Sequence, residues 1–401
     1  MIRQLLRRQA PLAPLGVAAN AGAAALILVI ATRRGDFADI GGFTAGASAG
    51  AFAAAGLSGG TSLSYVTGSR EQRATIRRLR STWVPMLLLL AGVALTLAYA
   101  ATTELPVWAV AMGALSVCFT NMSELRSNDL QREEQILRLH ACTVGAKIVA
   151  VLATWVASID FSTAMTLAAA LTYLLLRVLK RGEREQRGNT VRGIEGLRLA
   201  YDPHLIGVSI ASILSLRLPF LVAPYVMTPV QTGAFATLLS TQQYVNTFLT
   251  TGLYTVMAIR AKNRANAQLE PRMARLERAY LAGSFAVCFV LLLAGPAILG
   301  VLGFDSKAET TLWAVLIVIA IPAHTLNRAA QYRFHASQDG SSALRVLSWI
   351  TGIALGLSFA ALIFDAPLAV ALIPLVSEAL VAPIVYCWAR SMHPPRSNGR
   401  T

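Results

Sequence analysis

The chain has 401 residues, of which 55% are hydrophobic and 14% charged, and its formal net charge is +15. A soluble globular domain usually carries about 25% charged residues, so this composition indicates an integral membrane protein and not a soluble domain. The basic excess alone would suggest a nucleic-acid partner, but the positions of the basic residues argue against one. The four cysteines lie in apolar stretches without metal-ligand spacing, so we expect no disulfide framework, metal site or cofactor.

Two apolar runs, Pro11–Thr32 and Ile40–Val66, open the chain on either side of a short charged link. Each run exceeds the roughly 20 residues that a helix needs to cross about 30 Å of hydrocarbon. The second run carries Gly42, Gly46 and Gly50 at four-residue spacing, which predicts a bare helix face for close packing. The basic N-terminus has no small-residue cleavage site after it, so we expect a retained first span and not a signal peptide.

The whole chain divides into apolar segments of membrane length, which predicts an all-α polytopic membrane protein with twelve transmembrane helices. The predicted spans are 11–32, 40–66, 82–102, 106–124, 140–158, 161–179, 201–223, 232–258, 279–302, 310–330, 345–364 and 367–389. The links between them alternate between short, basic-poor segments and longer, basic segments. The basic-poor links hold only Arg33, Arg34 and Lys307 among the 35 Lys and Arg residues of the chain.

This alternation predicts the topology, because cytoplasmic links of membrane proteins carry the excess of Lys and Arg. An even number of spans with both termini on the basic side satisfies that rule, so we expect cytoplasmic N and C termini. The longest basic link divides the chain into two equal parts. We therefore expect two six-helix halves, 1–180 and 201–390, around a central cavity, joined by a cytoplasmic linker, 181–200, and followed by a cytoplasmic tail, 391–401.

Four stretches of the chain resemble a known family. They are RRGDFADIGGFTAGAS after the first span, LRLAYDPHLIGVSIASILSLRLPFL at the seventh, MTPVQTGAFATLLS before the eighth and LGFDSKAETTLWAVL before the tenth. The pattern resembles Wzx-type polysaccharide flippases of the multidrug/oligosaccharidyl-lipid/polysaccharide (MOP) exporter superfamily. The chain is short for that family, and its first outer turn has Asp-Phe-Ala-Asp where an acidic-Tyr-Gly-aromatic run is usual. The resemblance implies an inner-membrane translocase for polyprenyl-diphosphate-linked oligosaccharide that works with other polysaccharide-assembly membrane proteins.

Charged residues within the spans are the candidates for the substrate path, because a charge costs about 2.5–3.5 kcal/mol in hydrocarbon and normally faces protein or water. Four spans hold one such residue, namely Lys147, Arg217, Arg328 and Glu378. Arg217 and Lys147, with Arg33 and Arg34 of the first outer turn, are predicted to attract a diphosphate. The span-eight amides Gln242, Gln243 and Asn246 are predicted to contact sugar hydroxyls.

Structural roles remain open for the same residues. Arg328 can snorkel to the inner interface, and Lys147 can pair with Glu378 or another carboxylate for packing alone. Arg33 and Arg34 can form an interfacial group that nearby carboxylates balance. The amides can simply join helices, and the lone His324 of span ten is expected to be packed or cavity-lining.

Two functional alternatives also remain open. One is a small-molecule exporter of the same superfamily or another twelve-span carrier. The other is a membrane enzyme, such as a glycan polymerase or acyltransferase. Such enzymes generally need a large outer loop or clustered acid and base residues, and the basic-poor links here are all under ten residues long. We therefore expect a transporter and not an enzyme.

Overall fold

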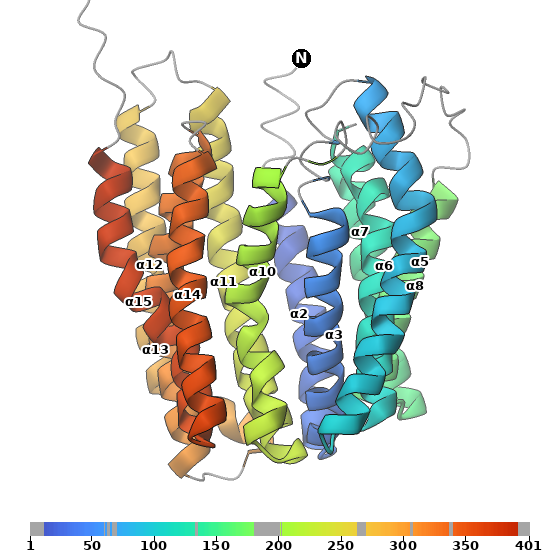
Figure 1. Ribbon diagram of the computed structural model, residues 1–401. Coiled ribbons are helices and arrows are strands. Elements are labelled where there is room, and N and C mark those ends of the chain that lie inside the picture. The colour runs from blue at the N-terminus through green and yellow to red at the C-terminus, as the bar shows by residue number, and fades with distance from the viewer. Residues whose placement is uncertain are drawn as a thin grey trace, which may run out of the picture.

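The computed structural model describes residues 12–59, 61, 65, 70–132, 135–179, 201, 203–262, 270–304, 308–336 and 340–391. Twelve helices with described bounds lie within these ranges, one for each predicted span (Figure 1). They are α2 (Leu12–Arg33), α3 (Phe37–Ser58), α5 (Arg70–Thr102), α6 (Val107–Arg132), α7 (Ile136–Ala157), α8 (Phe161–Leu179), α10 (Pro203–Val226), α11 (Pro229–Lys262), α12 (Glu270–Val301), α13 (Ala308–Ala336), α14 (Gly340–Ile363) and α15 (Pro367–Ser391). The predicted linker, 181–200, and the predicted tail beyond Ser391 lie outside the described residues.

Ten of the twelve helices are long and apolar enough to cross a membrane. The other two, α6 and α11, run alongside them for a similar height (Figure 1). They are more polar because they bury amides and hydroxyls inside the bundle, among them Asn121, Ser123, Thr237, Gln242 and Asn246. Together with the outward exposure of large apolar side chains such as Val93, Leu97, Phe289 and Leu293, this arrangement is that of a multi-pass membrane protein.

The second predicted span, 40–66, is interrupted near its C-terminal end, and the described Thr61 and Tyr65 beyond the break are again helical. Helix α3 stops at Ser58, and Gly59 leaves the helical region with φ −56° and ψ 136°. The pair Gly59-Gly60 explains the early end, because glycine is the weakest helix former apart from proline. Several other helices continue past the apolar run into polar sequence; α5, for example, begins at Arg70 although its predicted span began at 82.

The helices are described below as two sets in chain order, the blue-to-green and the green-to-red helices of Figure 1. Helices α2, α3 and α5 to α8 contact one another, and α10 to α15 contact one another. The principal contacts between the sets are those of α3 with α10 and α11, and of α2 with α11. The interface between the two sets is therefore formed mainly by four helices, α2, α3, α10 and α11.

The end of the bundle that carries the short turns after α2, α5, α7, α10 and α14 is called the turn end below. Helices α3 and α11 cross there, and glycine residues at the crossing allow their backbones to approach closely. A Cβ atom on Gly233 would overlap the carbonyl oxygen of Phe37, and one on Gly41 would lie 2.9 Å from the Gly233 nitrogen. Close by, the Tyr99 hydroxyl donates to the Leu221 carbonyl at 3.4 Å. The two sets are thus in direct backbone contact at the turn end.

The predicted bare face of the second span is confirmed. A Cβ atom on Gly46 would overlap the Val110 carbonyl of α6, and one on Gly42 would lie 2.8 Å from the Ala109 Cβ. Gly113 of α6 is equally restricted, since its Cβ would overlap the carbonyl of Phe43. Small residues on both helices allow the two backbones to approach closely, as in other membrane helix pairs.

Gly46→Val should therefore weaken the α3–α6 contact strongly. The new side chain meets backbone and not a flexible side-chain end, so we expect a loss of about 3 kcal/mol of stability, at the upper end of overpacking effects. The midpoint of thermal unfolding in detergent measures the change. Gly145→Val in α7 is the matched control, because nothing lies within 4 Å of its Cβ position. Equal midpoints for the two variants would contradict the close packing.

Candidate functional site

Arg217 is a half-buried cation in the middle of α10. It lies about 14 Å along the helix from Val226 at a rise of 1.5 Å per residue. Its guanidinium carbon is 5.7 Å from the centre of the Phe220 ring, a cation–π distance. It also interacts electrostatically with the Tyr244 phenol of α11. Among the residues that the structure describes, no carboxylate lies within ion-pair distance of it.

The span-eight amides lie on the α11 surfaces that meet α10 and α13. The Gln243 side chain donates to the Leu216 carbonyl of α10 at 3.2 Å, next to Arg217 in the chain. The Gln242 side chain donates to the Ile317 carbonyl of α13 at 2.9 Å. Asn246 is buried, and its side-chain oxygen has no hydrogen-bond partner. Arg217 and Gln243 are thus brought together, and two of the three amides join helices, as the structural alternative held.

Lys147 lies elsewhere, between α7 and α2. Its ammonium donates to the Asn20 carbonyl of α2 at 3.2 Å, and it is half-buried. Lys147 does not form the predicted ion pair with Glu378. The carboxylate of Glu378 is instead hydrogen-bonded to His324 and Asn327. Lys147 is therefore a second intramembrane cation, and it is hydrogen-bonded to a neutral carbonyl. The structure does not bring it next to Arg217 by any recorded contact.

Glu378 of α15 belongs to a cluster with α13. Its carboxylate lies 2.9 Å from Nδ1 of His324, and the Asn327 side chain donates to its carboxylate and, at 3.0 Å, to its backbone carbonyl. Arg328 is half-buried and donates to Gln331 at 2.9 Å within the same helix. Sequence reasoning treated His324 as a lone residue, because nothing in the chain order indicates that α13 and α15 are neighbours.

Arg33 and Arg34 bind the ends of other helices. The Arg33 side chain donates to the carbonyl of Val301, the last residue of α12, at 2.7 Å. Arg34 donates to the Trp155 carbonyl in the last turn of α7 at 3.5 Å. Cations at the C-termini of helices satisfy free carbonyls and oppose the negative end of the helix dipole. Partial burial raises the pKa of the adjacent Asp36, an effect that Arg34 opposes. Their predicted attraction for a diphosphate stays a prediction.

A polar network that sequence reasoning missed lies at the end of the bundle opposite the turn end. The Tyr65 hydroxyl donates to Asp129 at 2.7 Å, and Arg77 pairs with the same carboxylate at 3.0 Å. Burial and the bond to Asp129 raise the pKa of Tyr65 to about 12, so the phenol keeps its proton. Next to it, Arg80 pairs with Glu124 at 2.6 Å. The basic residues at this end of α5 thus bind α6 and are not all free for lipid headgroups.

Asp129→Ala should destabilise this end of the bundle. It leaves Tyr65 and Arg77 without their shared acceptor, and we expect a loss of about 2–3 kcal/mol, less than for a fully buried pair because Arg77 stays one-third exposed. Chemical denaturation in detergent measures the loss. Tyr65→Phe should cost about 1 kcal/mol, and the exposed Glu71→Ala provides the control. An unchanged stability of Asp129→Ala would contradict a structural role for the network.

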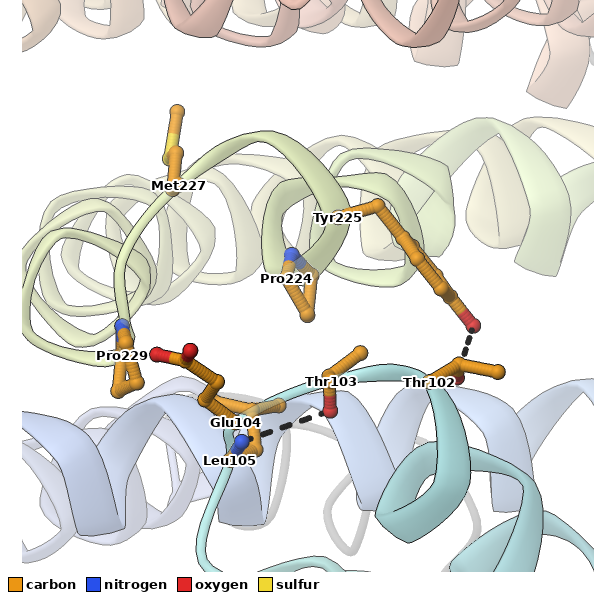
Figure 2. A pocket seen from close by; sticks show the side chains of 8 residues that line it. All are labelled: Thr102, Thr103, Glu104, Leu105, Pro224, Tyr225, Met227 and Pro229. Carbon is orange, nitrogen blue, oxygen red and sulfur yellow. Dashed lines mark hydrogen bonds between the residues drawn. The ribbon is translucent and has the colours of Figure 1, made fainter.

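A small pocket opens at the turn end between the two sets of helices. It has a volume of about 150 Å³ and is lined by 102–105 of the α5–α6 turn and by Pro224, Tyr225, Met227 and Pro229 (Figure 2). The Thr102 and Tyr225 hydroxyls meet across it at 3.5 Å. Each set supplies half of the lining, so the pocket lies at the interface between the two sets. The predicted central cavity itself stays a prediction.

No protein-family model and no curated protein sequence match the chain. Solved structures do match it over nearly its whole length. The lipid II flippase MurJ in an inward closed conformation aligns with a TM-score of 0.70 at 11% identity, over 96% of this chain and 88% of that one. An inward-facing multidrug resistance MATE family transporter of the MOP superfamily aligns with a TM-score of 0.66 at 14% identity, over 93% and 94%. The chain shares the fold of the MOP-superfamily transporters.

A third structure, a point mutant of the Vibrio cholerae MATE transporter VcmN, aligns with a TM-score of 0.59 at 13% identity, over 97% and 96% of the two chains. At identities this low the likeness shows the MOP fold alone. The comparison therefore confirms the fold that the resemblance implied. In the MOP fold of this chain, Arg217 lies on α10, one of the four helices that relate the two sets.

Proposed function

We propose that this protein is a flippase that moves a polyprenyl-diphosphate-linked oligosaccharide across the cytoplasmic membrane for cell-surface polysaccharide biosynthesis. The observation that carries the proposal is Arg217, a mid-membrane guanidinium without a carboxylate partner among the described residues. An intramembrane charge is expensive and normally functional. A guanidinium suits bidentate contact with a diphosphate, which is the charged group of such a substrate.

The surroundings of Arg217 support the same substrate. Tyr244 and Gln243 offer a hydroxyl and an amide beside the cation, and these groups suit sugar hydroxyls. The buried Asn246 carries an oxygen without a partner one turn after Gln242 on α11. Away from Arg217, Lys147 of α7 is a second intramembrane cation, which contacts α2. Among the chains of similar fold, MurJ is named as a flippase of lipid II.

The mechanism that we propose is alternating access. The two helix sets are the six-helix halves, and they rock about a central cavity while the lipid tail stays in the bilayer. The direct contact at the turn end then represents closure of the outer side. The positive-inside distribution supports cytoplasmic termini and an outer turn end. Other polysaccharide-assembly membrane proteins are the expected partners.

A multidrug exporter is the second candidate, because two of the chains with similar fold are MATE transporters, one of them named for multidrug resistance. An unpaired arginine in the path would repel cationic drugs, which favours an anionic substrate. The flippase proposal is tested in a deletion strain by measuring polyprenyl-diphosphate-linked oligosaccharide on the cytoplasmic side. Accumulation that the wild-type chain reverses supports the flippase. Normal levels together with altered sensitivity to small cationic compounds would support the exporter instead.

A further inference from the structure

The pair of His324 and Glu378 is buried in the interior of the second helix set. Only 9% of the His324 side chain and 10% of the Glu378 side chain remain accessible. Glu378 lies about 16 Å along α15 from Pro367, near mid-membrane depth. Ionisable groups in such a position face the interior and commonly serve ion or proton pathways. Neither residue contacts Arg217 directly, so the pair forms a site of its own.

The hydrogen bonds determine which atom of His324 can take up a proton. A carboxylate only accepts hydrogen bonds, so Nδ1 of His324 carries a hydrogen and donates to Glu378. Asn327 donates to the same carboxylate and holds it in its ionised, accepting form. Nε2 is the remaining ring nitrogen, and within the described ranges no residue is hydrogen-bonded to it. A proton can therefore add to Nε2 while the Nδ1 bond stays in place.

Three ionisable groups, His324, Glu378 and Arg328, lie close together where α13 meets α15. Arg328, one turn further along α13, acts electrostatically on Glu378. With Glu378 ionised and His324 neutral, these three groups have no net charge; a proton on Nε2 makes the net charge +1. The other titratable groups described on α13, α15 and the helices packed around them are Arg217 and Tyr225 on α10, Tyr244 on α11, Arg275, Glu277, Arg278, Tyr280 and Cys288 on α12, Glu309 on α13, Arg345 on α14, and Tyr386 and Cys387 on α15.

We propose that Nε2 of His324 is the proton-binding site through which a transmembrane proton gradient drives transport. The proton adds to Nε2 from one side of the membrane and leaves from the same atom to the other, so one N–H bond forms and later breaks. Helix α13 is joined to α11 by the Gln242–Ile317 hydrogen bond, and α11 carries Gln243 and Tyr244 beside Arg217. A charge change at His324 therefore acts on a helix that borders the candidate substrate site. The coupling rests on the proposed flippase function; the proton site does not.

The proton site is tested without substrate, on the full-length chain in lipid nanodiscs with 15N-labelled histidine. The chain has five histidines, and the signal that is absent in His324→Gln identifies His324; this signal should change protonation state in a titration between about pH 5 and 9. Glu378→Gln should move its midpoint to lower pH by about 1–3 units, because the neighbouring negative charge is lost. The control is His140→Gln in α7. His140 has no carboxylate partner among the described residues, so this variant should leave the His324 signal in place. A His324 signal in one protonation state throughout would overturn the proposal.

The coupling is tested in proteoliposomes with a fluorescent short-chain polyprenyl-diphosphate disaccharide as the probe. A pH gradient of one unit should accelerate flipping by up to about tenfold, and His324→Gln should lose this response while His140→Gln keeps it. Flipping that responds to an electrical potential but not to a pH gradient would overturn the coupling. Absence of flipping by the wild-type chain under any gradient would instead overturn the proposed function, and the titration would still decide the proton site.

Discussion

Replacing Arg217 by glutamine should reduce flipping by about 10- to 100-fold. Charge-assisted hydrogen bonds are worth about 1.5–3 kcal/mol, and each 1.4 kcal/mol corresponds to a factor of about ten. The variant should fold at least as stably as the wild-type chain, because it removes a charge that has no carboxylate partner among the described residues. Cytoplasmic accumulation of the lipid-linked oligosaccharide in the complemented deletion strain measures the loss.

The control for Arg217→Gln is Arg345→Gln, which removes an exposed arginine from α14. Arg217→Lys should restore part of the activity, since lysine keeps the charge but not the bidentate geometry. Complete rescue by Arg217→Gln would show that the cation near Phe220 and Tyr244 has a structural role. The flippase proposal would then need another anion-binding group, of which Lys147 is the first to test.

Gly233→Val should prevent the turn end from closing as it does here. The valine side chain would meet the backbone of Phe37, so α3 and α11 must move apart by more than a side-chain rearrangement can provide. We expect at least a tenfold loss of transport and a lower thermal stability, since overpacking against backbone costs about 1–3 kcal/mol or more. The transport loss follows because alternating access requires both closed ends.

Thiol labelling measures this opening directly. A cysteine at the buried Thr232, beside Gly41, should become reactive to a membrane-impermeant maleimide in the Gly233→Val background and stay protected without it. Gly283→Val in α12 is the matched control, because nothing lies within 4 Å of its Cβ position. Equal protection in all three chains would show that the α3–α11 crossing tolerates the side chain and does not act as a closure.

The helices were predictable because each one is a local feature. A transmembrane helix satisfies its own backbone hydrogen bonds, so the length and apolarity of a segment suffice to identify it. Each of the twelve predicted spans corresponds to one helix, with differences at the ends, and the glycine face of α3 was correctly predicted from four-residue spacing. The end of α3 at Ser58 was missed because the predicted span was continued through Gly59, where the backbone leaves the helical region.

The candidate site was predicted only in part. The intramembrane charges could be picked out individually, because each is a rare residue in an apolar run. Their partners depend on which helices are neighbours, and nothing in the chain order indicates this. The contact of α13 with α15 places His324 against Glu378, and that of α2 with α7 places Lys147 against Asn20. The helix-end contacts of Arg33 and Arg34 were likewise missed.

The sequence by itself determined that this chain is a helical membrane protein, where its spans lie and which of them carry charge, since hydrophobicity and length act within one segment. Only the tertiary structure decided which charges are paired. It leaves Arg217 of α10 beside a tyrosine and an aromatic ring and gives Glu378 a histidine and an asparagine. The physical reason is that an electrostatic partner must lie within a few ångströms, and in a bundle such neighbours come from helices far apart in the chain.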